Sequence, residues 1–190
     1  MNSHTPQKIR DRTTIFSRDL LKSAGAVVGG AALLSLAAPL TFALPGTPIP
    51  LVLQNTLVLL VGLMLGSRLG ALAVMLFLAE AACGMPVLSF CRGGLAHFLS
   101  PTGGYLAGYI AGAYVTGLVY EKMKSRFSAL LALFAGNAVT YLFGVAWLAN
   151  YLGLQGAYMA GAVPFMVTDS AKILFSVGVL SLIHKRRSSL

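Results

Sequence analysis

Long apolar segments separated by short polar stretches dominate the chain after its first 19 residues. A helix needs about 20 predominantly apolar residues to cross the hydrocarbon core of a bilayer. Four of the segments approach or exceed that length, and two are shorter. The pattern predicts an all-α membrane protein whose spans are Leu20–Leu44, Leu51–Gly66, Leu69–Cys83, Gly103–Tyr120, Phe127–Asn150 and Ala160–Ile183.

The second and third segments are either one long helix or a hairpin of two short ones, broken at Gly66–Gly70. Basic residues collect on the cytoplasmic side of membrane proteins. With a hairpin there are six spans, and 12 of the 14 basic residues fall on one side. With one long helix, the six basic residues after position 120 that lie outside the spans would move to the outer side. The hairpin is therefore predicted, with both termini cytoplasmic and an uncharged external loop at 151–159.

The two ends of the chain are polar. Residues 1–19 carry four basic side chains and are predicted to form a cytoplasmic tail with at most a short helix; residues 185–190 form a basic tail, and the membrane domain is 20–184. A cleaved signal peptide is the alternative, because the sequence around Arg18 is similar to a twin-arginine leader and Ala43 could precede a cleavage site. However, Arg18 is followed by Asp19, and the apolar run exceeds a normal signal core. An uncleaved first span is favoured.

Composition supports the membrane assignment. The chain is 57% hydrophobic and 10% charged, whereas soluble domains carry roughly 25% charged residues. The net charge of +9 reflects topology rather than a nucleic-acid surface, since most basic residues flank apolar spans. No P-loop motif is present, and the histidines and cysteines lack metal-ligand spacing. Cys83 and Cys91 lie near one membrane face, either bridged or as free thiols.

The stretch Gly84–Gly112 interrupts the apolar pattern with two glycine pairs, two prolines and Arg92. Glycine permits positive φ, and proline ends regular hydrogen bonding. Irregular backbone at membrane depth is tolerated only where protein or a water-filled cavity satisfies its polar groups. The part of this stretch before Gly103 is predicted to be an external loop between the third and fourth spans. Composition alone leaves open whether this loop closes over a cavity.

Polar residues within the spans gather in the outer half of the predicted bundle. Residues spaced by three or four positions share one helix face, and three such faces occur in the last three spans. We expect these faces to enclose a cavity that opens outwards. The residues concerned are Gln54 and Asn55 on the second span, Glu80 on the third, Tyr105, Tyr109, Gly112 and Thr116 on the fourth, Asn137, Tyr141 and Gly144 on the fifth, and Asp169, Lys172 and Ser176 on the sixth; Arg92 lies on the loop beside them.

Asp169 and Lys172 are the strongest indication of a functional site in this sequence. Each ionisable group near a helix centre costs about 2.5–3.5 kcal/mol on insertion scales, so an intramembrane charge is by default a functional candidate. Alternatively, the two side chains only neutralise each other's charge, because residues at i, i+3 are neighbours on a helix surface. Similarly, Glu80 could simply pair with Arg92, and each buried amide could be an interhelical hydrogen bond. Catalysis has little support, because nothing orients His97 towards Cys91 as a base. No enzyme activity is predicted.

Three stretches together resemble the BioY family, the substrate-binding S components of energy-coupling-factor (ECF) biotin transporters. The stretches are GTPIPLVLQNTLVLLVGLMLGSRLGALAVMLFLAEAACGMPVL (46–88), GGLAHFLSPTGGYLAGY (93–109) and FMVTDSAK (165–172). Their combination is more specific than any single piece. Two departures are visible: Ser100 stands where a glycine commonly precedes PTGG, and SFC (89–91) replaces a more glycine-rich stretch.

The resemblance implies a six-helix bundle in the bacterial inner membrane that binds biotin from outside and needs no cofactor or metal. It also implies assembly with a membrane coupling protein and two cytoplasmic ATPases, although family members can occur without a dedicated set. A self-sufficient biotin carrier and an S component for another small vitamin remain alternatives. The positions that resemble the face offered to the coupling protein are Gly25, Ala26, Gly29 and Gly30.

The positions matched to ligand binding are Arg92, Asp169 and Lys172, with Glu80 less securely placed. Asp169 suits the ureido N–H groups of biotin, since an ionised carboxylate only accepts hydrogen bonds. Lys172 or Arg92 suits the valerate carboxylate.

Four further side chains complete the expected site. A donor to the ureido carbonyl and a wall for the thiophane ring are both needed. Gln54 or Asn137 could supply the donor, while Tyr109 and Tyr141 could wall the ring.

Overall fold

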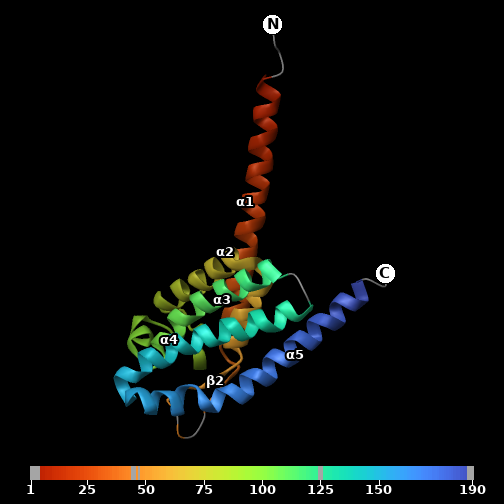
Figure 1. Ribbon diagram of the computed structural model, residues 1–190. Helices are drawn as coiled ribbons and strands as arrows, with labels where there is room; N and C mark the ends of the chain where they lie inside the picture. The colour runs from red at the N-terminus through yellow and green to blue at the C-terminus, as the bar shows by residue number, and fades with distance from the viewer. Residues whose placement is uncertain (1–4, 44–45, 47, 124–125, 188–190) are drawn as a thin grey trace.

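A computed structural model describes residues 5–43, 46, 48–123 and 126–187 of the chain. The described residues are almost entirely helical, which confirms the predicted class (Figure 1). Two short 3₁₀ helices and one two-stranded antiparallel sheet fill the connections. The elements are α1 (Thr5–Leu36), β1 (Thr41–Phe42), β2 (Leu51–Val52), α2 (Gln54–Ala82), η1 (Ser89–Cys91), η2 (Leu95–Leu99), α3 (Gly103–Met123), α4 (Arg126–Gly161) and α5 (Val163–Arg187).

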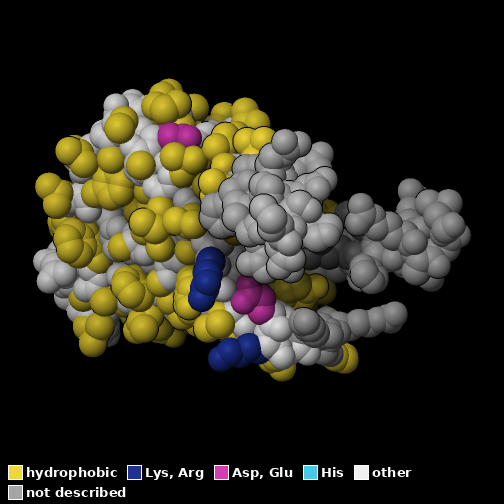
Figure 2. All heavy atoms as spheres, turned by 90° about the horizontal axis from the view of Figure 1, so that it is seen from above, with side chains coloured by type: hydrophobic (Ala, Val, Ile, Leu, Met, Phe, Trp, Pro, Cys, Tyr) yellow, Lys and Arg dark blue, Asp and Glu magenta, His cyan; other side chains and the backbone are white. Residues whose placement is uncertain are grey.

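The surface fits a membrane environment. Among the described residues, three helical stretches are long and apolar enough to cross a bilayer: Asp19–Leu36, Gln54–Ala82 and Phe127–Gly161. Hydrophobic side chains also cover most of the described face in Figure 2, where charged groups are few. Large side chains such as Phe127 and Phe175 are 74% exposed. Apolar exposure on this scale marks a surface that meets lipid or a partner.

Helix α2 reverses direction at Gly66, as the hairpin prediction requires. Gly66 has φ 84° and ψ 173°, a conformation that is essentially restricted to glycine. A Cβ atom placed on Gly70 would lie only 2.6 Å from Gly62 Cα, although residues eight apart in a straight helix are separated by about 12 Å. Glu121 on α3 accepts hydrogen bonds from the Ser67 N–H and hydroxyl, so it caps the returning half.

Helix α3 packs against both α2 and α4 at the centre of the bundle (Figure 1). Its approach to α2 is close because a Cβ atom on Gly62 would lie 2.3 Å from the Ala113 carbonyl oxygen. Helix α1 packs its last turns against the returning half of α2, where Leu34 joins the core with Val74 and Phe77. The N-terminal part of α1 projects away from the other helices (Figure 1).

The first helix differs from its prediction at both ends. It begins at Thr5, so the segment expected to hold at most a short helix is helical almost throughout. It ends at Leu36, whereas the predicted end, Leu44, lies outside the described residues. The helix ends early because Pro39 disfavours helical backbone at the residue before it. The chain then forms β1, which pairs with β2 through Thr41 and Val52. Two-residue strands leave no recognisable alternation, so this pairing was not predicted.

The connection at 151–159, predicted to be an uncharged external loop, is helical rather than irregular. Helix α4 continues to Gly161, interrupted only at Gly153, which has φ 70° and ψ 166°. The absence of charge indicates only the side of the membrane, and it is as compatible with a helical connection as with a loop. This helical segment packs Ala157 into a small core with Tyr105 and with Leu148 from the preceding part of α4.

Candidate ligand-binding site

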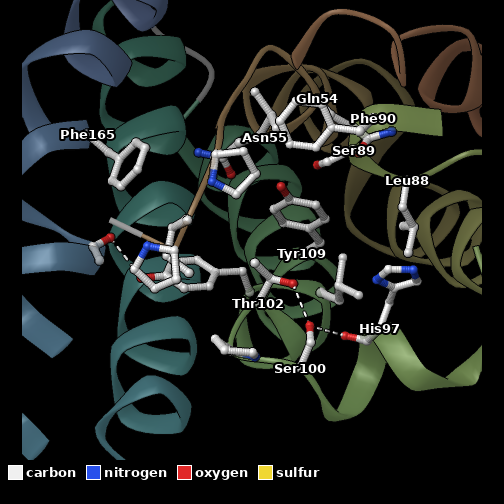
Figure 3. A pocket seen from close by; sticks show the side chains of 18 of the residues that line it. Gln54, Asn55, Leu88, Ser89, Phe90, His97, Ser100, Thr102, Tyr109 and Phe165 are labelled. Atoms are coloured by element: carbon white, nitrogen blue, oxygen red, sulfur yellow. Dashed lines mark hydrogen bonds between the residues drawn. The ribbon is translucent and has the colours of Figure 1, made fainter. Parts of the chain in front are cut away.

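A cavity of about 390 Å³ lies among the β1–β2 loop, the η1–η2 segment and helices α2 to α5 (Figure 3). This volume is within the usual range for a small-molecule site. Its walls are mainly apolar, with Ile49, Leu106 and Phe165 among the lining residues. Polar side chains line the rest, so the cavity combines an apolar middle with hydrogen-bonding groups.

Asp169 is the centre of the polar wall. It is 4% exposed, and its Oδ2 accepts hydrogen bonds from Tyr141 at 2.7 Å and Asn55 at 2.9 Å. Its Oδ1 accepts from Lys172 Nζ at 2.8 Å in an i, i+3 ion pair. A buried charge is tolerated only when paired and hydrogen-bonded, and Asp169 meets both conditions.

Lys172 does not line the cavity. Its ammonium group binds Asp169 and also donates to the Val52 carbonyl at 2.9 Å. It therefore connects α5 to strand β2 just before α2 begins. Helix α5 thus supplies the Asp169 carboxylate and, through Lys172, also holds strand β2 in place.

Two amides extend the polar wall from α2. Asn55 Nδ2 donates to Asn137 Oδ1 at 2.9 Å as well as to Asp169. Gln54 Nε2 donates to the Leu34 and Val87 carbonyls at 2.8 and 2.9 Å. Gln54 and Asn55 line the cavity, whereas Asn137 lies behind it. Gln54 thereby joins the end of α1 to the loop that follows α2.

The η1 turn is a tight loop at the cavity rim. Leu88 and Arg92 exchange two backbone hydrogen bonds across it. Within the turn, Phe90 and Cys91 have φ 59° and 53°, which is uncommon for residues with a side chain. The Arg92 guanidinium lies 5.7 Å from the centre of the Phe90 ring. This exposed cation is the positive group that the structure places on the cavity lining.

The η2 segment forms a second part of the rim. Ser100 donates to the His97 carbonyl at 2.7 Å and shares a hydrogen bond with Thr102 at 2.9 Å (Figure 3, dashed). His97, Ser100 and Thr102 all line the cavity. Ser100, which replaces a common family glycine, therefore has a defined role in closing this turn.

The structure brings together most of the predicted binding residues. Five of them line the cavity: Gln54, Arg92, Tyr109, Tyr141 and Asp169. Asn137 and Lys172 lie behind it and bond to Asn55 and Asp169. Glu80 lies apart, where its carboxylate accepts a hydrogen bond from Ser35 on α1 at 2.9 Å.

Sequence reasoning omitted several lining residues from the binding set. The sequence places Asn55 among the outer polar residues, but the expected donor is Gln54 or Asn137. Nothing in the sequence distinguishes His97 from a loop or packing residue. Ile49 and Phe165 carry no polar signal and are placed by tertiary packing. Cys83 and Cys91 are free thiols and exposed, so they do not form the disulfide that the sequence left open.

The small residues of α1 divide into two groups. A Cβ atom on Gly25 or Gly29 would meet no heavy atom within 4 Å. Gly30 instead is buried against Ala73, and its Cβ would lie 3.0 Å from the Ala73 side chain. Ala26 is partly exposed. Gly25 and Gly29 thus face away from the described bundle, while Gly30 packs within it.

Comparison with known proteins identifies a family. The BioY family model matches residues 7–189. The chain is 38% identical over 130 residues to the probable biotin transporter BioY of Pyrococcus horikoshii, covering 68% of this chain and 77% of that protein. It is 40% identical over 136 residues to the biotin transporter BioY of Rhizobium etli, covering 66% and 72%.

A solved structure is similar over most of the fold. The S-component for biotin from an ECF-type ABC transporter, determined at 2.1 Å, superposes with a TM-score of 0.79 at 25% identity. The match covers 88% of this chain and 93% of that one. The helical arrangement described above is therefore shared with a membrane transport subunit.

Proposed function

Since the chain belongs to the BioY family, we propose that it is a biotin-binding membrane subunit that mediates biotin uptake. The single observation that carries the proposal is the cavity of about 390 Å³ with an apolar middle, Asp169 and Asn55 in its polar wall and Arg92 at its rim. Biotin has a matching order of groups: a polar ureido ring, an apolar thiophane ring and a carboxylate at the end of a chain. Relatives that match most of this chain are biotin transporters by name.

Arg92 is the residue proposed to bind the carboxylate. Of the two cations considered from the sequence, Arg92 lines the cavity, whereas Lys172 is engaged with Asp169 and Val52. A guanidinium can bind a carboxylate through two parallel hydrogen bonds. Lys172 then contributes by holding the polar wall in place.

The proposed topology has six spans, because the reversal at Gly66 divides α2 into two crossings. Both termini are then cytoplasmic, and the cavity opens to the outer side of the bacterial inner membrane. The basic residues flanking the spans support this orientation.

Energy for uptake is proposed to come from a coupling protein with two ATPases. The similarity to an S-component of an ECF-type transporter supports this assembly. The open face of α1 at Gly25 and Gly29 is proposed to contact the coupling protein, since small residues let two membrane helices approach closely. Ala26 can contribute to the same contact, whereas Gly30 is already used within the chain.

The experiment is isothermal titration of the detergent-purified full-length protein with biotin, and with thiamine and riboflavin as controls. Saturable binding of biotin alone is expected. Binding of thiamine or riboflavin in place of biotin would instead indicate an S component for another vitamin. Uptake of biotin by vesicles that contain this chain without ATPases would indicate a self-sufficient carrier.

A further inference from the structure

His97 lines the cavity with a side chain that no described residue engages. It lies in η2, is half-buried, and shares the cavity rim with Arg92. Figure 3 shows His97 on the side of the cavity where Leu88 also lies, and the backbone of Leu88 is bonded to Arg92. Within the described part of the chain, neither ring nitrogen of His97 donates or accepts a hydrogen bond, since its polar contacts are made by its backbone. The imidazole is therefore an unused polar group at the rim.

The nitrogens of this imidazole are accessible. Among the described residues, the fully buried side-chain nitrogen and oxygen atoms without a hydrogen-bond partner are Asn55 Oδ1 and Thr56 Oγ1. The two His97 nitrogens also lack a partner but do not belong to this buried set, so they have accessible surface. Because the residue lines the cavity, a ligand inside it can approach the imidazole.

The position of His97 is fixed through its backbone. Its N–H donates to the Gly94 carbonyl at 3.2 Å, and its own carbonyl accepts from the Ser100 N–H at 3.3 Å. The Ser100 hydroxyl donates to the same carbonyl at 2.7 Å. The turn is thus closed without any contribution from the imidazole. The ring is held at the rim and remains free to bind a ligand.

The charges around the cavity indicate which ligand group the imidazole fits. Asp169 is already compensated by Lys172 at 2.8 Å, so this pair adds no net charge. A ligand carboxylate that leaves water needs hydrogen-bond donors for its two oxygens. Arg92 provides donors from one part of the rim. A protonated imidazole provides two further N–H donors and a second positive charge.

We infer that protonated His97 binds the ligand carboxylate together with Arg92. This inference rests on the proposed function and deepens it, because the rim then supplies one permanent cation and one that depends on pH. An imidazole ordinarily gains its second proton near pH 6.5, whereas an aliphatic carboxylate is half-protonated only near pH 4.3. Affinity for biotin is therefore expected to rise as the pH falls from about 7.5 to about 5.5.

Other ionisable groups on the surrounding elements do not account for such a change. Arginine, tyrosine and cysteine side chains ordinarily titrate above about pH 8, and carboxylic acids below about pH 5. His97 alone is of a type that titrates between these values. The groups concerned are Arg92 on the rim, Glu80 and Cys83 at the end of α2, Cys91 in η1, Tyr105 and Tyr109 on α3, Tyr141 and Tyr151 on α4, and Asp169 on α5.

The test is titration of the purified full-length protein with biotin and with biotin methyl ester at about pH 5.5 and about pH 7.5. The wild type is expected to bind biotin about fivefold more tightly at the lower pH, since a charged hydrogen bond is roughly twice as strong as a neutral one. Affinity for the uncharged ester should be equal at both values. His97→Gln keeps a hydrogen-bonding side chain that does not titrate, so it should abolish the difference for biotin. His97→Lys carries a permanent charge and should bind biotin tightly at both values.

His184→Gln is the matched control, because His184 lies about 22 Å along α5 from Asp169. Its pH response is expected to match the wild type. A wild type with the same pH response for acid and ester, or a His97→Gln protein that keeps the wild-type response, would overturn the inference while biotin binding stands. His97→Lys covers the case in which His97→Gln does not fold, since a retained pH response there would also overturn it. A wild type that binds no biotin at either pH would instead defeat the proposed function.

Discussion

Trp147 and Tyr151 lie one turn apart on α4 and donate hydrogen bonds to the consecutive carbonyls of Ser100 and Leu99. These carbonyls belong to the rim of the cavity, directly before the helix start at Gly103. Two donors on one helix face thus hold the end of η2 and the residue after it. Helix α4 orders this part of the rim together with the turns within the segment itself.

We expect Trp147→Phe to loosen this rim. The substitution keeps an aromatic ring and removes the Nε1 donor, which lies 2.9 Å from the Ser100 carbonyl. A typical hydrogen bond contributes about 0.5–1.5 kcal/mol, so affinity should fall two- to tenfold, mainly through faster dissociation. Stopped-flow displacement of bound biotin measures this rate. Tyr158→Phe, at an exposed position of the same helix, is the control, and equal dissociation rates in all three proteins would contradict the expectation.

The ion pair between Lys172 and Asp169 gives a prediction about stability. Removing one partner of a buried pair leaves an uncompensated charge and costs on the order of 3–5 kcal/mol. The side chains are 20% and 6% exposed, so Lys172→Met should lower the thermal unfolding temperature in detergent markedly. The double variant Lys172→Met/Asp169→Asn should recover part of the loss, because no isolated charge then remains. Equal unfolding temperatures for the wild type and Lys172→Met would show that the pair is not stabilising.

Asp169→Asn should weaken biotin binding more than tenfold. The substituted amide would present an NH₂ group where Asp169 now accepts from Lys172 or Tyr141, so the polar wall that orients Asn55 would rearrange. Titration of purified variants measures the effect. Affinity equal to the wild type would remove Asp169 from the site.

Arg92→Gln should discriminate between charged and uncharged ligands. Arg92 lines the cavity from its exposed rim and is the proposed partner of the biotin carboxylate. Affinity for biotin should fall more than tenfold, since hydrogen bonds between charged groups contribute roughly 1.5–3 kcal/mol. Affinity for biotin methyl ester, which carries no charge, should change little. Equal losses for both ligands would indicate that Arg92 shapes the loop without binding the carboxylate.

Much of the fold and part of the site could be predicted because bilayer physics restricts the options. Intramembrane charges must be compensated, and this requirement indicated Asp169 and Lys172 without any knowledge of the fold. The sequence could not predict that Asp169 lines the cavity while Lys172 lies behind it, since helical spacing places both residues on one face. Only the path of β2 shows that Lys172 turns to the Val52 carbonyl. Likewise, Glu80 is polar and near the outer side, but its partner Ser35 comes from the neighbouring helix α1.

The reversal at Gly66 gives a final prediction, which concerns the fold alone. Gly66 has φ 84° and ψ 173°. At the next residue, the Ser67 N–H donates a hydrogen bond to the Glu121 carboxylate at 2.7 Å. Glu121→Ala should cost about 1 kcal/mol of stability, as loss of a helix cap does. Gly66→Ala should cost more, because alanine is strained in this region of φ and ψ and its Cβ would lie 2.5 Å from Glu121 Oε1.

Neither residue lines the cavity, so biotin affinity of the folded fraction should match the wild type. Thermal unfolding combined with titration separates the two effects, and a loss of affinity without a loss of stability would mean that the hairpin takes part in ligand binding.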